Sequence, residues 1–130
     1  MLRCPVDYGL CDRKVTVYHR EGDEISRTVY DRAFFDTRRS RSLEREGERG
    51  GTSFLLVIPG ELQAVEVGDK VIAGEGPVVE GREAWRRFVP ALVPGLAVVS
   101  HVDVKHWQGR IVHTEAAGKL LRVSNLAQMR

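Results

Sequence analysis

Three histidines in the last third of the chain have two carboxylates near them and are the residues best suited to metal binding or acid–base catalysis. They are His101, His106 and His113, with Asp103 and Glu115 close by. If a strand continues from His101 through Asp103, both side chains share one face, because side chains alternate along a strand. The sequence has no HExxH or GxSxG pattern and no glycine-rich phosphate loop. We therefore predict no catalytic residues, no cofactor and no enzyme activity. A metal-dependent enzyme using these histidines remains an alternative.

The two cysteines offer a second set of candidate metal ligands. Cys4 and Cys11 are spaced more widely than the usual C-x(2–4)-C zinc motif. His19 could join them, but the second pair of ligands that a zinc finger needs is absent. We interpret the cysteines as ordinary thiols and leave metal binding by Cys4 and Cys11 open. Two cysteines do not form a disulfide framework, which favours synthesis in a reducing cytoplasm.

An arginine-rich segment, residues 36–51, interrupts the apolar patterning of the chain. Its sequence is DTRRSRSLEREGERGG, in which Leu43 is the one large apolar residue. Such a segment buries too little apolar surface to offset the entropy of ordering it, so we expect a flexible charged loop. The loop is either solvated and mobile, or it orders on a neighbouring subunit or a phosphate backbone. The candidate contacts with a partner or subunit are Arg38, Arg39, Arg41, Arg45 and Arg49.

Short β-branched and apolar runs, bounded by glycine, proline and aspartate, indicate the elements that would position these residues. Gly68 and Asp69 predict a tight turn in which Asp69 bonds the backbone just ahead of it. Trp85, Phe88 and Val89 form one stripe of a short helix that Pro90 ends, and we expect Trp85 and Phe88 to cap the core. We expect strands at 14–19, 25–35, 54–58, 70–73, 96–102, 110–115 and 120–123, a loop at 103–108 and an irregular arm at 1–13.

These elements predict one domain, residues 1–130, of mainly β class. The expected architecture is a small antiparallel β-barrel or sandwich with one short helix and a long charged loop. The strand at 25–35 mixes polar and apolar residues on both faces, so we expect one face to meet solvent or a neighbouring subunit. A net charge of +2 is too small to indicate nucleic acid from the whole-chain balance. The apolar runs are too short or too interrupted for a membrane span, and we expect neither membrane contact nor a signal peptide.

Four motifs of turn and strand residues give the chain a likeness to a known class of protein. They are Val57-Ile58-Pro59-Gly60, residues 67–76, Leu92-Val93-Pro94-Gly95, and residues 106–113 with Glu115-Ala116. Over roughly residues 14–118 the chain resembles small minor structural proteins encoded in the head–tail region of tailed phages and of prophages in Gram-positive bacteria. That resemblance implies a small β-barrel that forms a ring at the connector, as a stopper or head-completion protein, or sits near it as a minor capsid component.

The resemblance also implies a location and partners. The protein would be made in the cytoplasm of the bacterial host and would reside in the virion as a homo-oligomer or ring. Its partners would be connector, portal or tail proteins, with packaged DNA as a further candidate contact. Stopper, adaptor, tail-completion and minor capsid roles all stay open. The alternative from a different class is a small β-barrel that binds nucleic acid through the arginine-rich loop, with Trp85 or Trp107 stacking on bases.

Overall fold

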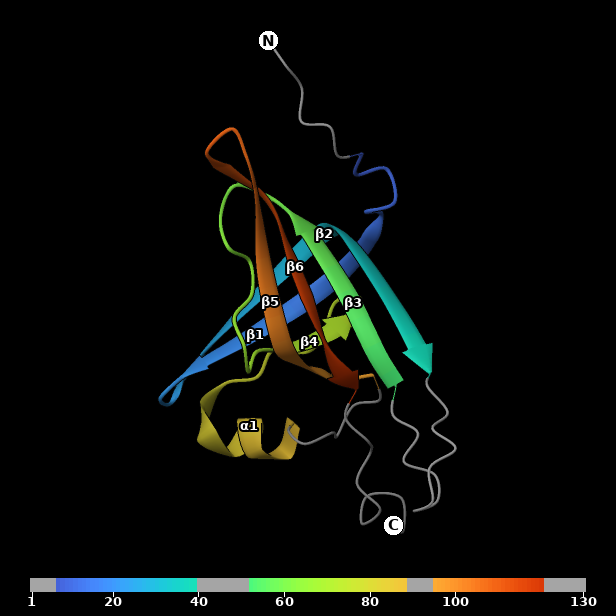
Figure 1. Cartoon of the computed structure of the whole chain (residues 1–130). Helices are drawn as coiled ribbons and strands as arrows, with labels where there is room; N and C mark the ends of the chain where they lie inside the picture. The colour runs from blue at the N-terminus through green and yellow to red at the C-terminus, as the bar shows by residue number, and fades with distance from the viewer. Residues whose placement is uncertain (1–6, 40–51, 89–94, 121–130) are drawn as a thin grey trace, which may run out of the picture.

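The structure is a computed structural model that describes residues 7–39, 52–88 and 95–120. Within these residues the chain forms a closed antiparallel barrel with the strand order β1-β2-β3-β6-β5-β4 (Figure 1). The predicted mainly-β class with one short helix is confirmed, and the barrel replaces the sandwich alternative. The elements are β1 (Arg13–Glu21), β2 (Glu24–Arg39), β3 (Thr52–Pro59), β4 (Lys70–Ala73), α1 (Gly81–Phe88), β5 (Ala97–Trp107) and β6 (Arg110–Leu120).

The barrel interior is filled by alternate side chains of the strands, as the period of two requires. Leu56 and Ile58 of β3 are essentially inaccessible and pack with Val15, Val17 and other apolar residues of the facing strands. Full burial of a side chain of this size stabilises a fold by about 1.5–3 kcal/mol, so this cluster is the main source of stability. The other buried members are Ala33, Phe35, Phe54, Val65, Val71, Ala97, Val99 and Ala116.

A second apolar cluster joins α1 to the outside of the barrel. Tyr18 of β1 is fully buried there and lies against the rings of Trp85 and Phe88, with centroid separations of 6.4 and 4.8 Å. The Tyr18 hydroxyl donates a hydrogen bond of 2.6 Å to the carbonyl of Pro77. The prediction that Trp85 and Phe88 cap the core is therefore confirmed.

β2 changes its partner along its length. It pairs with β1 as far as Ala33 and with β3 from Phe34 onward. A bulge lies at the change, because Arg13 and Val15 of β1 oppose Ala33 and Tyr30 of β2. The extra β2 residue shifts the face that points inward, so that Tyr30 packs against the core and Ala33 and Phe35 are buried within it. This shift explains why neither face of residues 25–35 has a continuous apolar pattern.

Three expected boundaries are wrong. Residues 36–39 belong to β2 and not to the charged loop, because they pair with residues 52–55 of β3. Residues 103–107 are strand and not loop, since β5 continues alongside β6 to its last residue. The gap expected between the strands at 110–115 and 120–123 is absent, because β6 runs unbroken to Leu120. The rest of the charged loop, 40–51, and of the last expected strand, 121–123, lies outside the described residues, as does Val89.

Candidate interaction surface

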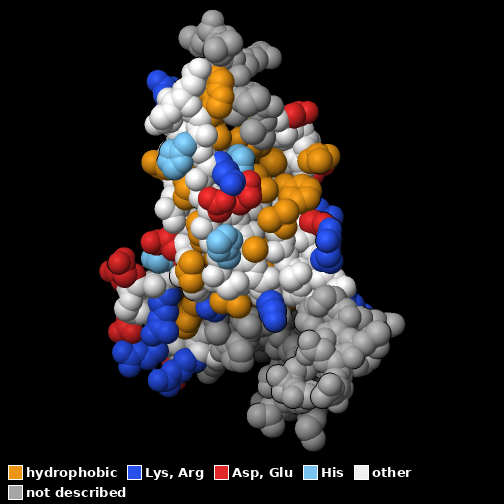
Figure 2. Space-filling view, in the orientation of Figure 1, with side chains coloured by type: hydrophobic (Ala, Val, Ile, Leu, Met, Phe, Trp, Pro, Cys, Tyr) orange, Lys and Arg blue, Asp and Glu red, His pale blue; other side chains and the backbone are white. Residues whose placement is uncertain are grey.

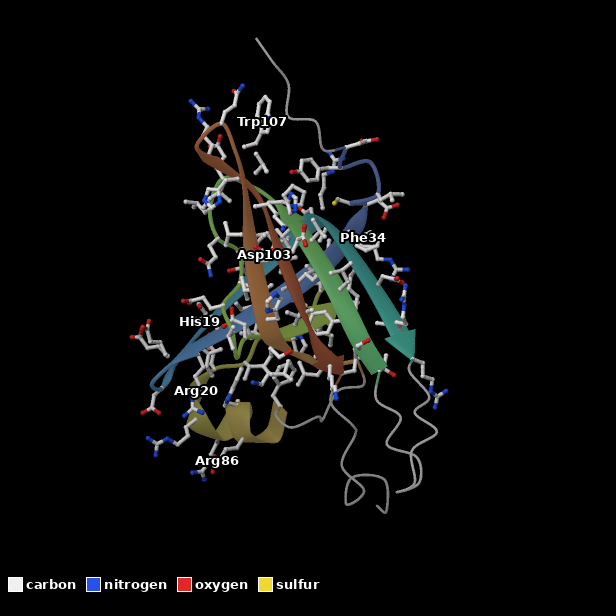
Figure 3. The ribbon with its side chains drawn as sticks, in the orientation of Figure 1. His19, Arg20, Phe34, Arg86, Asp103 and Trp107 are labelled. Carbon is white, nitrogen blue, oxygen red and sulfur yellow. The ribbon has the colours of Figure 1, made fainter. Side chains whose placement is uncertain are left out.

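Four apolar side chains gather on the outside of the barrel, over β2, β3 and β6. Phe34 lies opposite Val57, and Leu55 lies opposite Ala117, so the four occupy adjacent positions on outward-facing rows. Leu55 is 45% exposed and the other three are half-buried. We call Phe34, Leu55, Val57 and Ala117 the outer-wall patch. Figure 2 shows hydrophobic side chains gathered on this side of the molecule, and Figure 3 places Phe34 there on β2.

The neighbouring strand positions on β6 and β5 are polar and form ion pairs. Val57 is followed in its row by Glu115 and then by Asp103 of β5. Asp103 lies 2.6 Å from the ammonium of Lys105, and this hydrogen bond lowers the pKa of Asp103 and raises that of Lys105. An apolar centre beside a charged rim is the usual composition of a protein–protein interface.

The three candidate histidines do not converge on one site. His101 is exposed on β5, on the same face as Asp103 as predicted, and His106 is exposed near the end of that strand. His113 is buried, and its Nε2 lies 2.9 Å from Glu115. Because a carboxylate can only accept, Nε2 of the ring donates, and in the neutral ring Nδ1 then accepts from the Tyr8 hydroxyl at 2.8 Å. This chain of contacts holds the segment before β1 against β6.

A second contact between distant segments, the His19 junction, involves His19. The sequence suggested this residue only as an additional zinc ligand. Its Nδ1 lies 2.6 Å from Oδ1 of Asp69, and its Nε2 lies 3.3 Å from a carboxylate oxygen of Glu66. The hydrogen bond with Asp69, opposed by burial and assisted by the surrounding carboxylates, raises the pKa of His19. Figure 3 shows His19 on β1, beside the loop that precedes β4. Asp69 lies fifty positions away in sequence, and no local pattern links the two.

Asp69 also fixes its own loop, as the turn prediction required. Its second carboxylate oxygen accepts a hydrogen bond from the backbone N–H of Glu66 at 2.9 Å, and Gly68 has a φ of 96°. The backbones of Gly68 and Asp69 exchange hydrogen bonds with Val99 of β5. A cleft of about 310 Å³ opens between this loop and the β1–β2 hairpin. The junction thus joins three parts of the barrel, which is a structural role.

Of the five candidate arginines, the structure describes Arg38 and Arg39. Both are exposed at the end of β2, and Arg38 shares an outward row with Ser53 of β3 and Lys119 of β6. Arg41, Arg45 and Arg49 lie outside the described residues. The two tryptophans do not join the arginines. Trp85 is buried, and Trp107 lies nine positions along β5 from the row of Lys119, roughly 30 Å at the rise of an extended strand.

Metal binding through the cysteines is not tested, because Cys4 lies outside the described residues. Cys11 is a buried free thiol whose pKa is raised by burial. Over residues 7–39, 52–88 and 95–120, no group of three or more His, Cys, Asp and Glu side chains could hold a metal ion. In the same part of the chain, no helix has the length and apolar character needed to cross a membrane.

The class that the geometry defines is a small closed β-barrel with a partly exposed apolar patch on its wall. Comparison of the sequence with models of known families and with curated proteins, and comparison with solved structures, finds no match.

Proposed function

We propose that this protein is a structural subunit that acts by assembly and not by catalysis. Following the resemblance of its turn motifs, we assign it to the head–tail interface of a phage or prophage virion, as a stopper, head-completion or minor capsid component. It would reside in the virion, in contact with copies of itself and with connector, portal or tail proteins. The observation that carries the proposal is the outer-wall patch, where Leu55 stays 45% exposed beside three other apolar side chains.

The patch favours assembly because of where it lies. The outward face of an antiparallel sheet that meets only solvent is normally polar, whereas each of two adjacent rows here contains a neighbouring pair of apolar residues. A patch on the side of a barrel, meeting a different surface of the next copy, is a head-to-tail contact, and such contacts close into rings when the rotation permits.

Leu55→Arg tests the proposal. Leu62→Arg is the matched control, because Leu62 is 81% exposed and lies in the loop after β3. We expect the wild type and Leu62→Arg to form rings, alone or on added portal or connector rings, in light scattering and negative-stain electron microscopy. Leu55→Arg should keep the wild-type far-ultraviolet circular dichroism and lose these assemblies. Equal assembly by Leu55→Arg, or no assembly of the wild type under either condition, would contradict the proposal.

Nucleic-acid binding is the second candidate, supported by exposed cations at one end of the barrel. Arg38 and Lys119 occupy one outward row, and Arg39 follows Arg38. Binding through phosphates would weaken steeply with salt, by a log–log slope of about −0.9 per phosphate neutralised on duplex DNA. A gel-shift series in rising salt should then show weaker binding by Arg38→Ala/Arg39→Ala than by Arg20→Ala, an exposed β1 arginine. No shift by the wild type at low salt would exclude this candidate.

A further inference from the structure

Among the described residues, no strand lies beside one edge of the first half of β2. Residues 24–33 pair with β1 on one side, while pairing with β3 on the other side begins only at Phe34. Among the described residues, no backbone hydrogen bond outside the strand ladders involves residues 24–32. An unpaired edge of this length is a template for adding another strand, unless charge, proline or a covering loop blocks it.

The turn geometry identifies which backbone groups point away from β1. Glu21 and Glu24 face each other across the two-residue turn, in which Gly22 has a φ of 65°. The pair that closes a two-residue hairpin is hydrogen-bonded, and hydrogen-bonded pairs then alternate along the ladder. The backbone N–H and C=O groups of Ser26 and Thr28 therefore bond to β1. Those of Ile25, Arg27 and Val29 point to the open edge, and none of these three residues is fully buried.

We propose that the occupant of this edge is the same edge of a second copy, paired antiparallel about a two-fold axis through Thr28. This register places Arg27 of each copy opposite Val29 of the other, so that outward-pointing groups meet. It also places Glu24 opposite Arg32 at both ends of the contact. Both side chains are exposed, and neither forms an ion pair within the part of the chain that the structure describes.

The charges along the edge favour this register over its neighbours. A two-fold axis through Arg27 would bring the two Arg27 side chains together and would set Asp23 against Asp31. An axis through Val29 would pair Arg27 with Asp31, but these groups already have partners within the chain. Arg27 donates two hydrogen bonds to the carbonyl of Gly76, and Asp31 lies 3.8 Å from Lys14. Glu24 and Arg32 are the pair left for a partner.

This two-fold contact is separate from the outer-wall patch and goes beyond the proposed function. The edge belongs to residues 24–32 of β2, whereas the patch begins at Phe34 and extends over β3 and β6. Leu55→Arg should therefore leave the two-fold dimer intact while it removes larger assemblies. Failure of one contact does not imply failure of the other.

Charge reversal at Glu24 and Arg32 tests the contact in the full chain. Either Glu24→Arg or Arg32→Glu turns two attractive pairs into two repulsive ones, and we expect the dimer Kd in sedimentation velocity to rise about tenfold. The double variant should restore the wild-type Kd, and an equimolar mixture of the two single variants should form heterodimers. Glu61→Arg is the control, because Glu61 is exposed in the loop after β3 and is not paired with β2. A wild type that stays monomeric, or single variants with unchanged Kd, would overturn the proposal.

Hydrogen exchange provides a readout at the edge itself. In the monomer the amides of Ile25, Arg27 and Val29 should exchange quickly, and those of Ser26 and Thr28 slowly. Above the dimer Kd we expect the three outward amides to become at least about tenfold slower, because each gains a hydrogen bond to the partner strand. A dimer in which these amides still exchange at the monomer rate would place the contact elsewhere and refute strand pairing.

Discussion

Gly118 of β6 is a position where one methyl group should be strongly destabilising. It lies two residues before the end of the strand, paired with Phe54 of β3 and Val99 of β5. A Cβ atom there would overlap the carbonyl oxygen of Val98 and would lie 2.9 Å from Cε1 of Phe54. The bulge of β5 between Val99 and His101 lies beside it. Glycine is required because the neighbouring backbone occupies the space of a side chain.

The cost of Gly118→Ala can be worked from these contacts. Overpacking a well-filled core costs about 1–3 kcal/mol when side chains can adjust. Here the main obstacle is backbone, so relief of the overlap should also weaken a ladder hydrogen bond, worth about 1 kcal/mol. We expect a loss of about 3 kcal/mol in the free energy of unfolding. For a chain of this length that corresponds to a Tm lower by about 10–15 °C.

Urea unfolding monitored by tryptophan fluorescence, with calorimetry for Tm, would measure the effect. Lys119→Ala should change stability by less than about 0.5 kcal/mol, because Lys119 is exposed. Gly109→Ala separates backbone strain from overlap, since Gly109 has a φ of 76° and open space around it. The free energy of unfolding of Gly109→Ala should fall by only about 1–2 kcal/mol. A loss below about 1 kcal/mol for Gly118→Ala would refute the steric reasoning.

Three further predictions concern the His19–Asp69 contact and the Tyr18 cluster. The pKa of His19 is raised in the folded state. Its contribution to folding stability is therefore fully present below the unfolded-state pKa and is lost as the pH rises through the folded-state pKa. His19→Gln should therefore cost more stability in urea at pH 6 than at pH 8.5, and an equal cost at both would contradict this. Tyr18→Phe removes the donor to the Pro77 carbonyl and should lower the free energy of unfolding in urea by about 1–2 kcal/mol. Unchanged stability would contradict the hydrogen bond. Trp85→Ala should lower the free energy of unfolding by about 3–5 kcal/mol. It should also reduce the near-ultraviolet circular dichroism of the Tyr18 cluster. Unchanged spectra would argue against the docking of α1.

The elements that the sequence predicts correctly are those determined by neighbouring residues. The Gly68–Asp69 turn follows from the positive φ that glycine tolerates and from the reach of a short carboxylate to the Glu66 N–H. Trp85 and Phe88 are recognisable as a buried stripe from their spacing on a single helical turn. In both cases the physical cause lies within a few residues of the chain, so it can be inferred from local composition and spacing.

The errors have non-local causes. Residues 36–39 are polar enough to suggest a loop, but β3 satisfies their backbone groups and extends β2 regardless of side-chain type. The gap expected after residue 115 contains Gly118, whose small size in fact accommodates the Val98 carbonyl of the neighbouring strand. The candidate surface depends on the same information. Leu55 and Ala117 become neighbours only when the register of β3 against β6 is known.

The bulge in β2 links the two proposed contact surfaces. Because one β2 residue has no counterpart on β1, the strand bends there and transfers from β1 to β3. Before the transfer, no described strand lies beside its second edge, where we propose that Ile25, Arg27 and Val29 meet a second copy. After the transfer, the inward face is reset, so Phe35 enters the core and Phe34 turns outward to begin the outer-wall patch. A continuous ladder with β1 would carry the inward face of Tyr30 on to Phe34 and bury it. The same irregularity that closes the barrel therefore produces both the open edge and the exposed apolar wall.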